Sequence, residues 1–232
     1  MPFDPNAFDS SYPVPETLGQ YTAKTFLWMV LGLLITFAVA IGSWISGLVL
    51  VTIRFHWIIL IATLVLSFTM GARIEKMGVG TAKTIFLAFS VLFGLTMSIY
   101  LLVYDFASLI LVFLATAVYF GVLAAYGFLT HRDLSGLRTI LTTGLIFLIV
   151  CGVILMFVPG FTWLDNISCL IGIMVFLVFT AYDTQMIRSY YHYYSGYPDM
   201  MEKAAIFSAL QLYLDFINLF LYLLRFLGRS KD

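Results

Sequence analysis

The chain has 232 residues, of which 62% are hydrophobic and 10% are charged, and its formal net charge is zero. Soluble domains are nearer half apolar and a quarter charged, so this composition excludes an ordinary soluble protein and places most of the chain in a lipid bilayer. A neutral chain also offers no basic surface for nucleic acid. Cys151 and Cys169 lie in apolar stretches, where we interpret them as small buried residues. With no metal-ligand cluster and no glycine-rich phosphate loop in the sequence, we expect neither a cofactor nor an enzyme.

Residues 1–24 form a proline-rich leader without an apolar run. A cleavable signal peptide needs a basic start and an apolar core, so we interpret this segment as a cytoplasmic leader. The remainder, 25–232, is predicted to be one transmembrane domain. Its seven apolar stretches are expected at about 25–47, 57–72, 84–103, 108–128, 139–158, 167–187 and 204–226. Their lengths and composition predict an all-α protein that crosses the membrane seven times.

The distribution of Lys and Arg predicts the orientation, because cytoplasmic loops carry an excess of these residues. With seven spans, the side that faces the N-terminus holds Lys24, Arg73, Lys76, Lys83, Arg132, Arg138, Arg188 and Lys203. The opposite side holds Arg54, Arg225, Arg229 and Lys231. The excess on the first side predicts a protein of the bacterial inner membrane with a cytoplasmic N-terminus. A re-entrant last segment would return the basic tail to the cytoplasm, but we favour a full span because 204–226 contains no Gly or Pro.

The last apolar stretch carries polar residues at alternating spacings of three and four. They are Ser208, Gln211, Asp215, Asn218, Tyr222 and Arg225. This spacing puts them on one face of a helix. A polar face is stable in a membrane when protein surrounds it, so we predict that the last helix is central.

Asp183 and Asp215 are the only acidic residues within the seven apolar stretches. An ionisable group at such a depth is costly unless it is paired or hydrated, and it often marks an ion path or a proton relay. Asp215 lies about 16 Å along its span, and Asp183 about 12 Å from the end of its own if that helix continues to about Tyr191. Antiparallel neighbours joined by a short loop can therefore bring the two carboxyl groups together.

Two close carboxyl groups in a medium of low dielectric constant cannot both ionise cheaply, so they are expected to share a proton. The protonated pair would hold two helices together, whereas the ionised pair would repel itself or attract a cation. Ca²⁺ prefers carboxylate and amide oxygens, and Gln211 and Asn218 share the face of Asp215. Arg73 is a candidate latch that could pair with Asp183 instead, and a switch between these partners would gate a pore. The plainer alternatives are a static tie between helices for the aspartates and an interfacial anchor for Arg73.

Two segments, AYDTQ (181–185) and LYLDFINLFLYLLR (212–225), resemble the signature segments of the Bax inhibitor family, also called TMBIM or lifeguard proteins. HRDLSG (131–136) and RIEKM (73–77) resemble its bacterial branch, and the hydropathy pattern agrees along the chain after residue 20. The resemblance implies a seven-helix bundle with a central last helix. It also implies a pH-sensitive calcium leak controlled by two aspartates and an arginine, here Asp183, Asp215 and Arg73.

Three functions compete at this point. The first is a proton-gated Ca²⁺ leak in the lipid bilayer. The second is a membrane regulator without transport, and some bacterial members of the family are linked to restraint of a membrane-bound AAA protease. The third is an intramembrane aspartyl protease, which would require a Gly-x-Gly-Asp segment where this chain has Leu212–Asp215, and a Pro-Ala-Leu segment that it lacks. We favour the leak and reject the protease.

Overall fold

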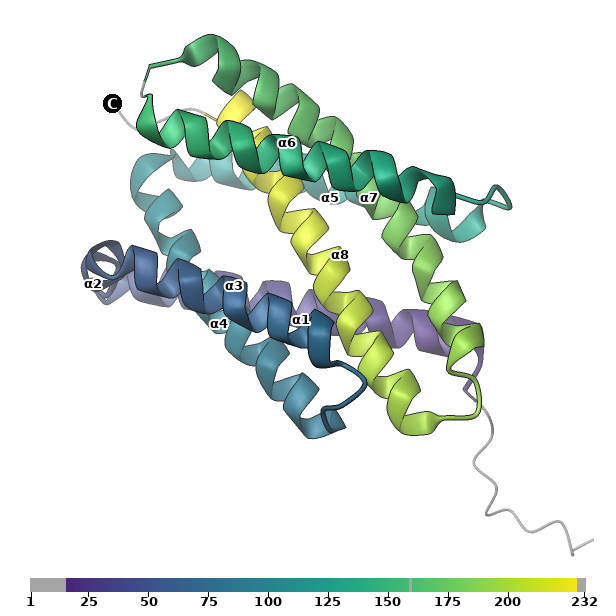
Figure 1. Cartoon of the computed structure of the whole chain (residues 1–232). Helices are drawn as coiled ribbons and strands as arrows, with labels where there is room; N and C mark the ends of the chain where they lie inside the picture. Colours follow the sequence, from purple (N-terminus) through teal and green to yellow (C-terminus); the bar gives the residue numbers. More distant parts are fainter. Residues whose placement is uncertain (1–15, 159, 229–232) are drawn as a thin grey trace, which may run out of the picture.

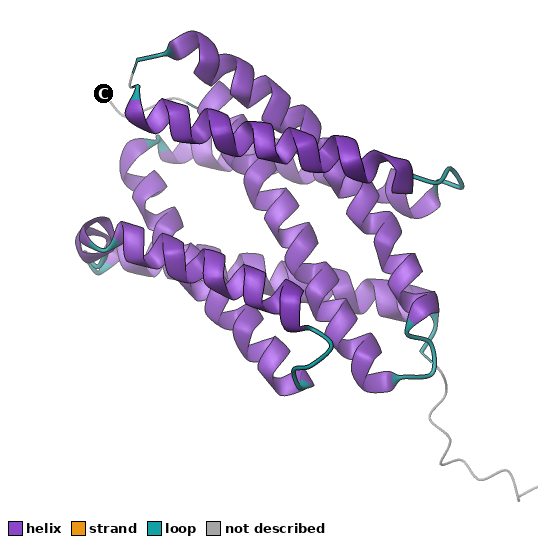
Figure 2. Cartoon of the chain, in the orientation of Figure 1, coloured by secondary structure: helices purple, strands orange, loops and turns teal. Residues whose placement is uncertain are grey.

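The computed structural model describes residues 16–158 and 160–228, and every regular element within these ranges is a helix (Figures 1 and 2). The elements are α1 (Leu18–Ile45), α2 (Val49–Arg54), α3 (His56–Arg73), α4 (Val79–Val103), α5 (Phe106–Leu129), the 3-10 helix η1 (Ser135–Leu137), α6 (Arg138–Phe157), α7 (Thr162–Tyr193) and α8 (Pro198–Leu227). Seven of these helices are long and apolar enough to span a membrane. The predicted all-α, seven-span class is confirmed.

The first span begins earlier than the sequence predicted, at Leu18 instead of residue 25. Thr17 is the N-cap: its hydroxyl oxygen accepts from the Gln20 backbone N–H, and its own backbone N–H donates to the Gln20 side-chain oxygen, which completes a capping box. This local signal starts the helix before the apolar run does, so only part of the expected leader precedes α1. Residues 1–15 of that leader lie outside the described residues.

The last two helices are longer than their apolar stretches. Helix α7 continues to Tyr193, and α8 begins at Pro198 rather than at residue 204. Proline is favoured in the first turn of a helix, and Gly196, at a φ of 90°, makes the tight turn between the two helices. At 1.5 Å per residue α8 is about 45 Å long, so it extends beyond the hydrocarbon core. We call the membrane side on which α1 and α8 begin the N-terminal side; it is the side predicted to be cytoplasmic.

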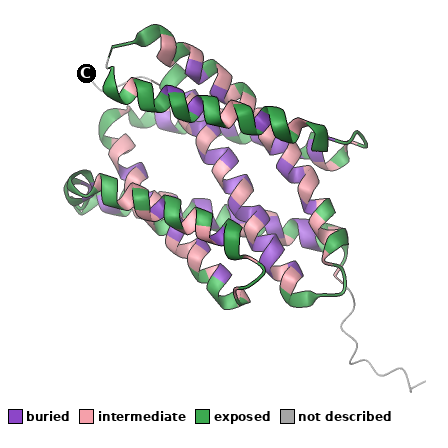
Figure 3. Ribbon diagram, in the orientation of Figure 1, coloured by how far each residue is buried: buried purple, intermediate pink, exposed green. Residues whose placement is uncertain are grey.

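Helix α8 is the central element of the bundle. In its most apolar stretch 72% of the residues are buried inside the protein, against 33% or less for every other span. Figure 1 shows α1, α3 and α4 on one side of α8, and α5, α6 and α7 on the other. Figure 3 shows the buried residues following α8, whereas the outer helices are exposed on the surface that faces lipid. The prediction of a central last helix is confirmed.

Helices cross closely where a glycine removes a side chain. A Cβ at Gly94 of α4 would lie 2.7 Å from the Thr36 carbonyl oxygen of α1, and one at Gly127 of α5 would overlap the backbone of Ala181 on α7. Lipid tails are as apolar as the helices, so membrane helices associate through such close packing and through hydrogen bonds rather than through the hydrophobic effect. The crossing at Gly127 lies two residues from Asp183 and fixes α7 beside α5.

Helices α1, α4 and α8 also meet through buried hydrogen bonds. The Thr36 hydroxyl lies 2.6 Å from the Tyr213 hydroxyl and donates to the Ser90 carbonyl oxygen at 3.0 Å. Tyr213 is fully buried and surrounded by Phe86, Phe89 and Phe93. Since a buried hydroxyl is costly without a partner, this junction fixes the rotation of α8 two residues before Asp215.

Candidate functional site

The site is built from the α7–α8 hairpin. The two helices are antiparallel neighbours joined by residues 194–197, so Asp183 near the end of α7 can face Asp215 on α8. Both aspartates are buried, with exposed fractions of 7% and 4%. The structure therefore brings together the two carboxyl groups that helical spacing predicted to be neighbours, while their functional role stays a prediction.

The two carboxyl groups lie close enough to interact across the contact between α7 and α8. Two buried carboxyl groups this close cannot both ionise cheaply, so a proton shared between them is the favoured state. Oδ2 of Asp215 is fully buried, and no donor group among the described residues reaches it. A proton shared within the pair supplies the donor that the surrounding protein does not.

The nearest hydroxyls on α7 are already engaged. Thr180 donates to the Phe176 carbonyl oxygen at 2.8 Å, and Thr184 donates to the Thr180 carbonyl oxygen at 2.7 Å. Both threonines are buried beside Asp183, but their protons go to the backbone of their own helix. They give the site a polar wall without neutralising either aspartate.

The predicted polar face of α8 contributes unequally to the site. Ser208 is buried, and its hydroxyl has no partner among the described residues. The Asn218 amide donates to the Leu214 carbonyl oxygen, one turn away, at 2.8 Å. Gln211 and Tyr222 are half-buried, and the Tyr222 ring stacks on Phe176 of α7. The face thus continues from Ser208 to Tyr222, with Asp215 near its middle.

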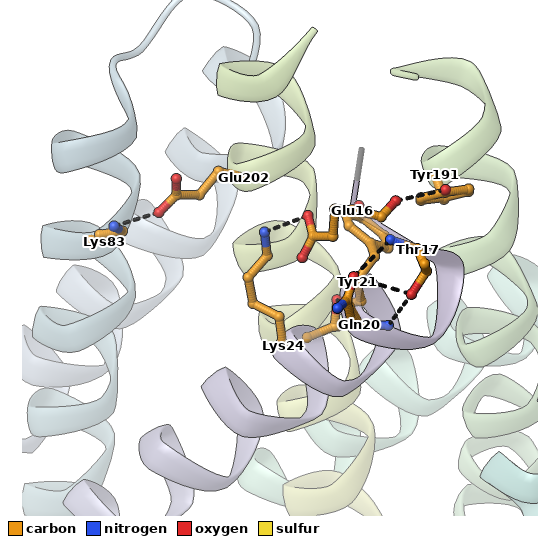
Figure 4. A network of polar contacts seen from close by, with 9 residues as sticks. Glu16, Thr17, Gln20, Tyr21, Lys24, Lys83, Tyr191 and Glu202 are labelled. Atoms are coloured by element: carbon orange, nitrogen blue, oxygen red, sulfur yellow. Dashed lines mark hydrogen bonds and ion pairs between the residues drawn. The ribbon is translucent and has the colours of Figure 1, made fainter. Parts of the chain in front are cut away.

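A network of polar contacts on the N-terminal side joins the start of α1 to the end of α7 (Figure 4). The Tyr191 hydroxyl of α7 donates to the Glu16 carbonyl oxygen at 2.7 Å, and Lys24 pairs with the Glu16 carboxylate at 2.8 Å. Lys83 of α4 pairs with Glu202 of α8 on the same side. The start of α1 is therefore tied to the end of α7, over the hairpin that carries the two carboxyl groups.

The opposite side is closed by contacts between the other ends of the same two helices. Arg225 of α8 forms an ion pair with Asp165 of α7, and its guanidinium lies 5.8 Å from the centre of the Tyr222 ring. A Cβ at Gly172 would lie 2.6 Å from that ring, so the glycine makes room for Tyr222. The hairpin is thus joined on both sides of the carboxyl pair.

Arg73, the candidate latch, is not brought to the pair. It is the last residue of α3, it is exposed, and within the described part of the chain no ion pair joins it to either aspartate. Arg73 lies instead beside Lys76 at a surface pocket of about 470 Å³. The reason is that α3 packs mainly on α4 and scarcely touches α8. The expected contact with Asp183 is absent from this conformation.

Three positioning residues were missed by the sequence reasoning. Gln185 accepts from the Leu134 backbone N–H at 2.9 Å and donates to the Arg132 carbonyl oxygen at 2.8 Å, so it holds the α5–α6 connection against α7. Arg188 donates to the Phe128 carbonyl oxygen at the end of α5. The signal for Gln185 was present, since AYDTQ and HRDLSG are two of the segments that resemble the family.

In the α5–α6 connection, hydrogen bonds from the backbone N–H and the hydroxyl of Ser135 hold the pKa of the exposed Asp133 carboxyl below its usual value.

The third missed residue is Lys203, which is 6% exposed near the start of α8. It donates to the carbonyl oxygens of Glu75 and Met77 in the α3–α4 connection, at 3.2 and 3.1 Å. Lys203 directly follows Glu202 in a polar segment, so nothing in the sequence set it apart from a surface lysine.

The fold and the site together define a class: a polytopic membrane protein whose central helix carries one half of a buried carboxyl pair. A family model described as "Bax1-I: Inhibitor of apoptosis-promoting Bax1" matches residues 18–232. The chain belongs to this Bax inhibitor family.

Bacterial relatives extend over nearly the whole chain. The inner membrane protein YbhL of Escherichia coli (strain K12) is 38% identical over 224 residues, covering 92% of this chain and 93% of the relative. A protein of Rickettsia prowazekii (strain Madrid E) is 36% identical over 221 residues, covering 94% and 92%, and one of Deinococcus radiodurans is 34% identical over 222 residues, covering 94% of each chain. The predicted bacterial branch and inner-membrane location are confirmed.

Proposed function

We propose that this protein is a pH-sensitive cation leak, with Ca²⁺ as its permeant ion, gated by the carboxyl pair of Asp183 and Asp215. The observation that carries the proposal is the pair itself: two buried carboxyl groups close together on neighbouring membrane helices, with no donor at Asp215 Oδ2 among the described residues. We infer that the pair is not that of an aspartyl protease, because it lacks the sequence context of one.

The gate follows from the charge of the pair. With one shared proton, the pair is a hydrogen-bonded clasp between α7 and α8. Loss of that proton leaves two carboxylates in contact, and their repulsion favours separation of the helices or entry of a cation between them. Flux should therefore rise with pH through the range in which the pair loses its shared proton.

The ligand count fits a permeant ion rather than a stored one. Ca²⁺ takes six to eight oxygens, and two carboxylates supply at most four. The Ser208 hydroxyl, which has no partner among the described residues, and the side-chain oxygens of Gln211 and Asn218 lie on the same face of α8. Binding by so few fixed ligands would be weak enough for a partly hydrated ion to leave again, as conduction requires.

The decisive experiment measures Ca²⁺ influx into proteoliposomes of the purified chain between pH 6 and pH 8. The Asp183→Asn/Asp215→Asn double variant removes both ionisable groups and keeps the side-chain size, so it should show no pH-dependent flux. Asp105→Asn is the matched control, because Asn is as good an N-cap as Asp for α5. A pH response that the double variant retains would refute gating by the pair.

A second function, that of a membrane regulator, is favoured if no flux is found. The end of α7 and the α7–α8 connection present Tyr193 and Tyr197, which are 75% and 67% exposed, on the N-terminal side. Exposed aromatic residues of this kind suit a protein interface, so a regulator that contacts a membrane-bound AAA protease is the alternative. No flux above that of empty liposomes at any pH would favour this function and reduce the carboxyl pair to a structural tie.

A further inference from the structure

A long apolar groove lies between α1 and α5. Helix α1 packs mainly on α4 and α8, and α5 mainly on α7 and α8, which leaves a space of about 570 Å³ where α1 and α5 face each other. This volume is in the range of about 300–1,000 Å³ that is typical of ligand sites. The groove runs from Thr22 to Phe37 on α1 and from Phe113 to Phe128 on α5, about 22 Å on each helix.

The position of the groove determines what can fill it. Both helices are membrane spans, and the residues at the rim are open to the bilayer, as the 63% exposed Leu34 illustrates. The lining is almost entirely Phe, Leu, Val, Met and Ala, and such an apolar space does not hold water. Its floor is Phe216 of α8, which follows Asp215 directly. An occupant of this groove therefore touches the central helix from the side.

One end of the groove is polar. At the N-terminal side Thr22 lines the groove, and its hydroxyl is buried without a partner among the described residues. The guanidinium of Arg188 lies 5.7 Å from the centre of the Phe128 ring, at the same end. One of its N–H groups donates to the Phe128 carbonyl oxygen, and an arginine has five such donors, so it can hold a phosphate as well.

We propose that this groove binds one phospholipid of the N-terminal-side leaflet, with an acyl chain between α1 and α5 and its phosphate at Arg188. A groove that is apolar along its length and has a cationic side chain beside one end matches the charge distribution of such a lipid. The inference does not depend on the proposed leak, because it concerns a different surface of the bundle.

The test uses native mass spectrometry of the delipidated full chain in detergent, titrated with palmitoyl-oleoyl phosphatidylglycerol. Gly121 lines the groove, and a Cβ there would meet nothing within 4 Å, so Gly121→Phe should fill the groove without disturbing the helices. Gly152→Phe is the matched control, since Gly152 is a similarly open glycine on the outer face of α6. Equal elution volume and helix content of the variants establish that both are folded.

The wild type should bind one lipid saturably. Gly121→Phe should bind it at least about tenfold more weakly, because the loss of contact for only two lipid methylene groups already reduces affinity by that factor. Gly152→Phe should bind like the wild type. Arg188→Gln should weaken phosphatidylglycerol binding and leave binding of the matching diacylglycerol unchanged. Equal lipid binding by the two glycine variants would overturn the proposal, as would a protein dimer that Gly121→Phe abolishes, which would identify a second copy as the occupant.

Discussion

Helix α1 contacts the bundle along two lines that differ in how they are closed. On the first, the sealed seam with α4 and α8, Gly94 lets the backbones approach and Thr36 binds both Tyr213 and the Ser90 carbonyl oxygen. On the second, the open seam with α5, an edge-to-face pair of Phe37 and Phe113 joins the two helices. The comparison shows what closes a helix interface in a membrane: small residues and hydrogen bonds, not apolar surface, because lipid can cover apolar surface equally well.

The largest effect should come from placing a side chain in the sealed seam. Gly94→Leu would drive its Cβ into the Thr36 carbonyl oxygen and Val39, and we expect a loss of about 3 kcal/mol in the free energy of unfolding. The same change in the open seam, Gly121→Leu, meets open space and should be neutral or stabilise by about 0.5–1 kcal/mol, since glycine weakens a helix. Thermal unfolding in detergent measures both, and equal losses would remove the distinction between the seams.

A smaller loss is expected at the N-terminal-side end of α8. Lys203→Met removes the ammonium group that donates to the Glu75 and Met77 carbonyl oxygens. Because hydrogen bonds from charged groups are stronger than neutral ones, we expect the free energy of unfolding to fall by about 2 kcal/mol. Hydrogen exchange should accelerate in the α3–α4 connection. Lys76→Met removes the same charge from an exposed position and serves as the control. Unchanged exchange in Lys203→Met would mean that packing alone holds this connection.

Removal of one hydroxyl sharpens the comparison further. Tyr213→Phe keeps the ring among its aromatic neighbours but breaks the 2.6 Å contact between the Tyr213 and Thr36 hydroxyls. We expect this change to lower the free energy of unfolding by about 1 kcal/mol. Tyr119→Phe changes a tyrosine that is 53% exposed on α5 and should leave the unfolding temperature unchanged. If both variants unfold at the wild-type temperature, the hydroxyl contact contributes nothing to the seal.

The smallest effect belongs to the open seam itself. Phe37→Leu removes the edge-to-face contact with Phe113. We expect the free energy of unfolding to fall by less than about 1 kcal/mol, because lipid can occupy the vacated volume. The measurement is again thermal unfolding, compared between detergent and lipid nanodiscs. A loss greater than that of Tyr213→Phe would reverse the order of the two seams.

Much of the architecture could be predicted because apolar length and polar spacing act locally. The spans follow from hydropathy, and the polar face from Ser208 to Tyr222 indicated that α8 needs protein around it. The juxtaposition of Asp183 and Asp215 followed from a short loop between antiparallel helices. The early start of α8 was missed, and the continuation of α7 to about Tyr191 entered only as a condition, because hydropathy carries no information where these helices enter water.

The remaining features depend on contacts between distant parts of the chain. The position of Arg73 is set by the packing of α3 on α4, which leaves this arginine away from α8. Lys203 binds carbonyl oxygens more than 120 residues earlier, and any lysine in sequence presents the same three donors. The open seam arises because α5 packs on α7 through Gly127, and no local pattern distinguishes that glycine from Gly121.

The central place of α8 has a consequence for biosynthesis. Chains emerge from the ribosome N-terminus first, so six spans are made before the helix around which they are arranged. Until α8 inserts, Asp183 lacks its partner, Thr36 lacks Tyr213, and the α3–α4 connection lacks Lys203. The nascent bundle therefore holds an unfilled polar centre, and arrival of α8 completes all three sets of contacts in a single final step.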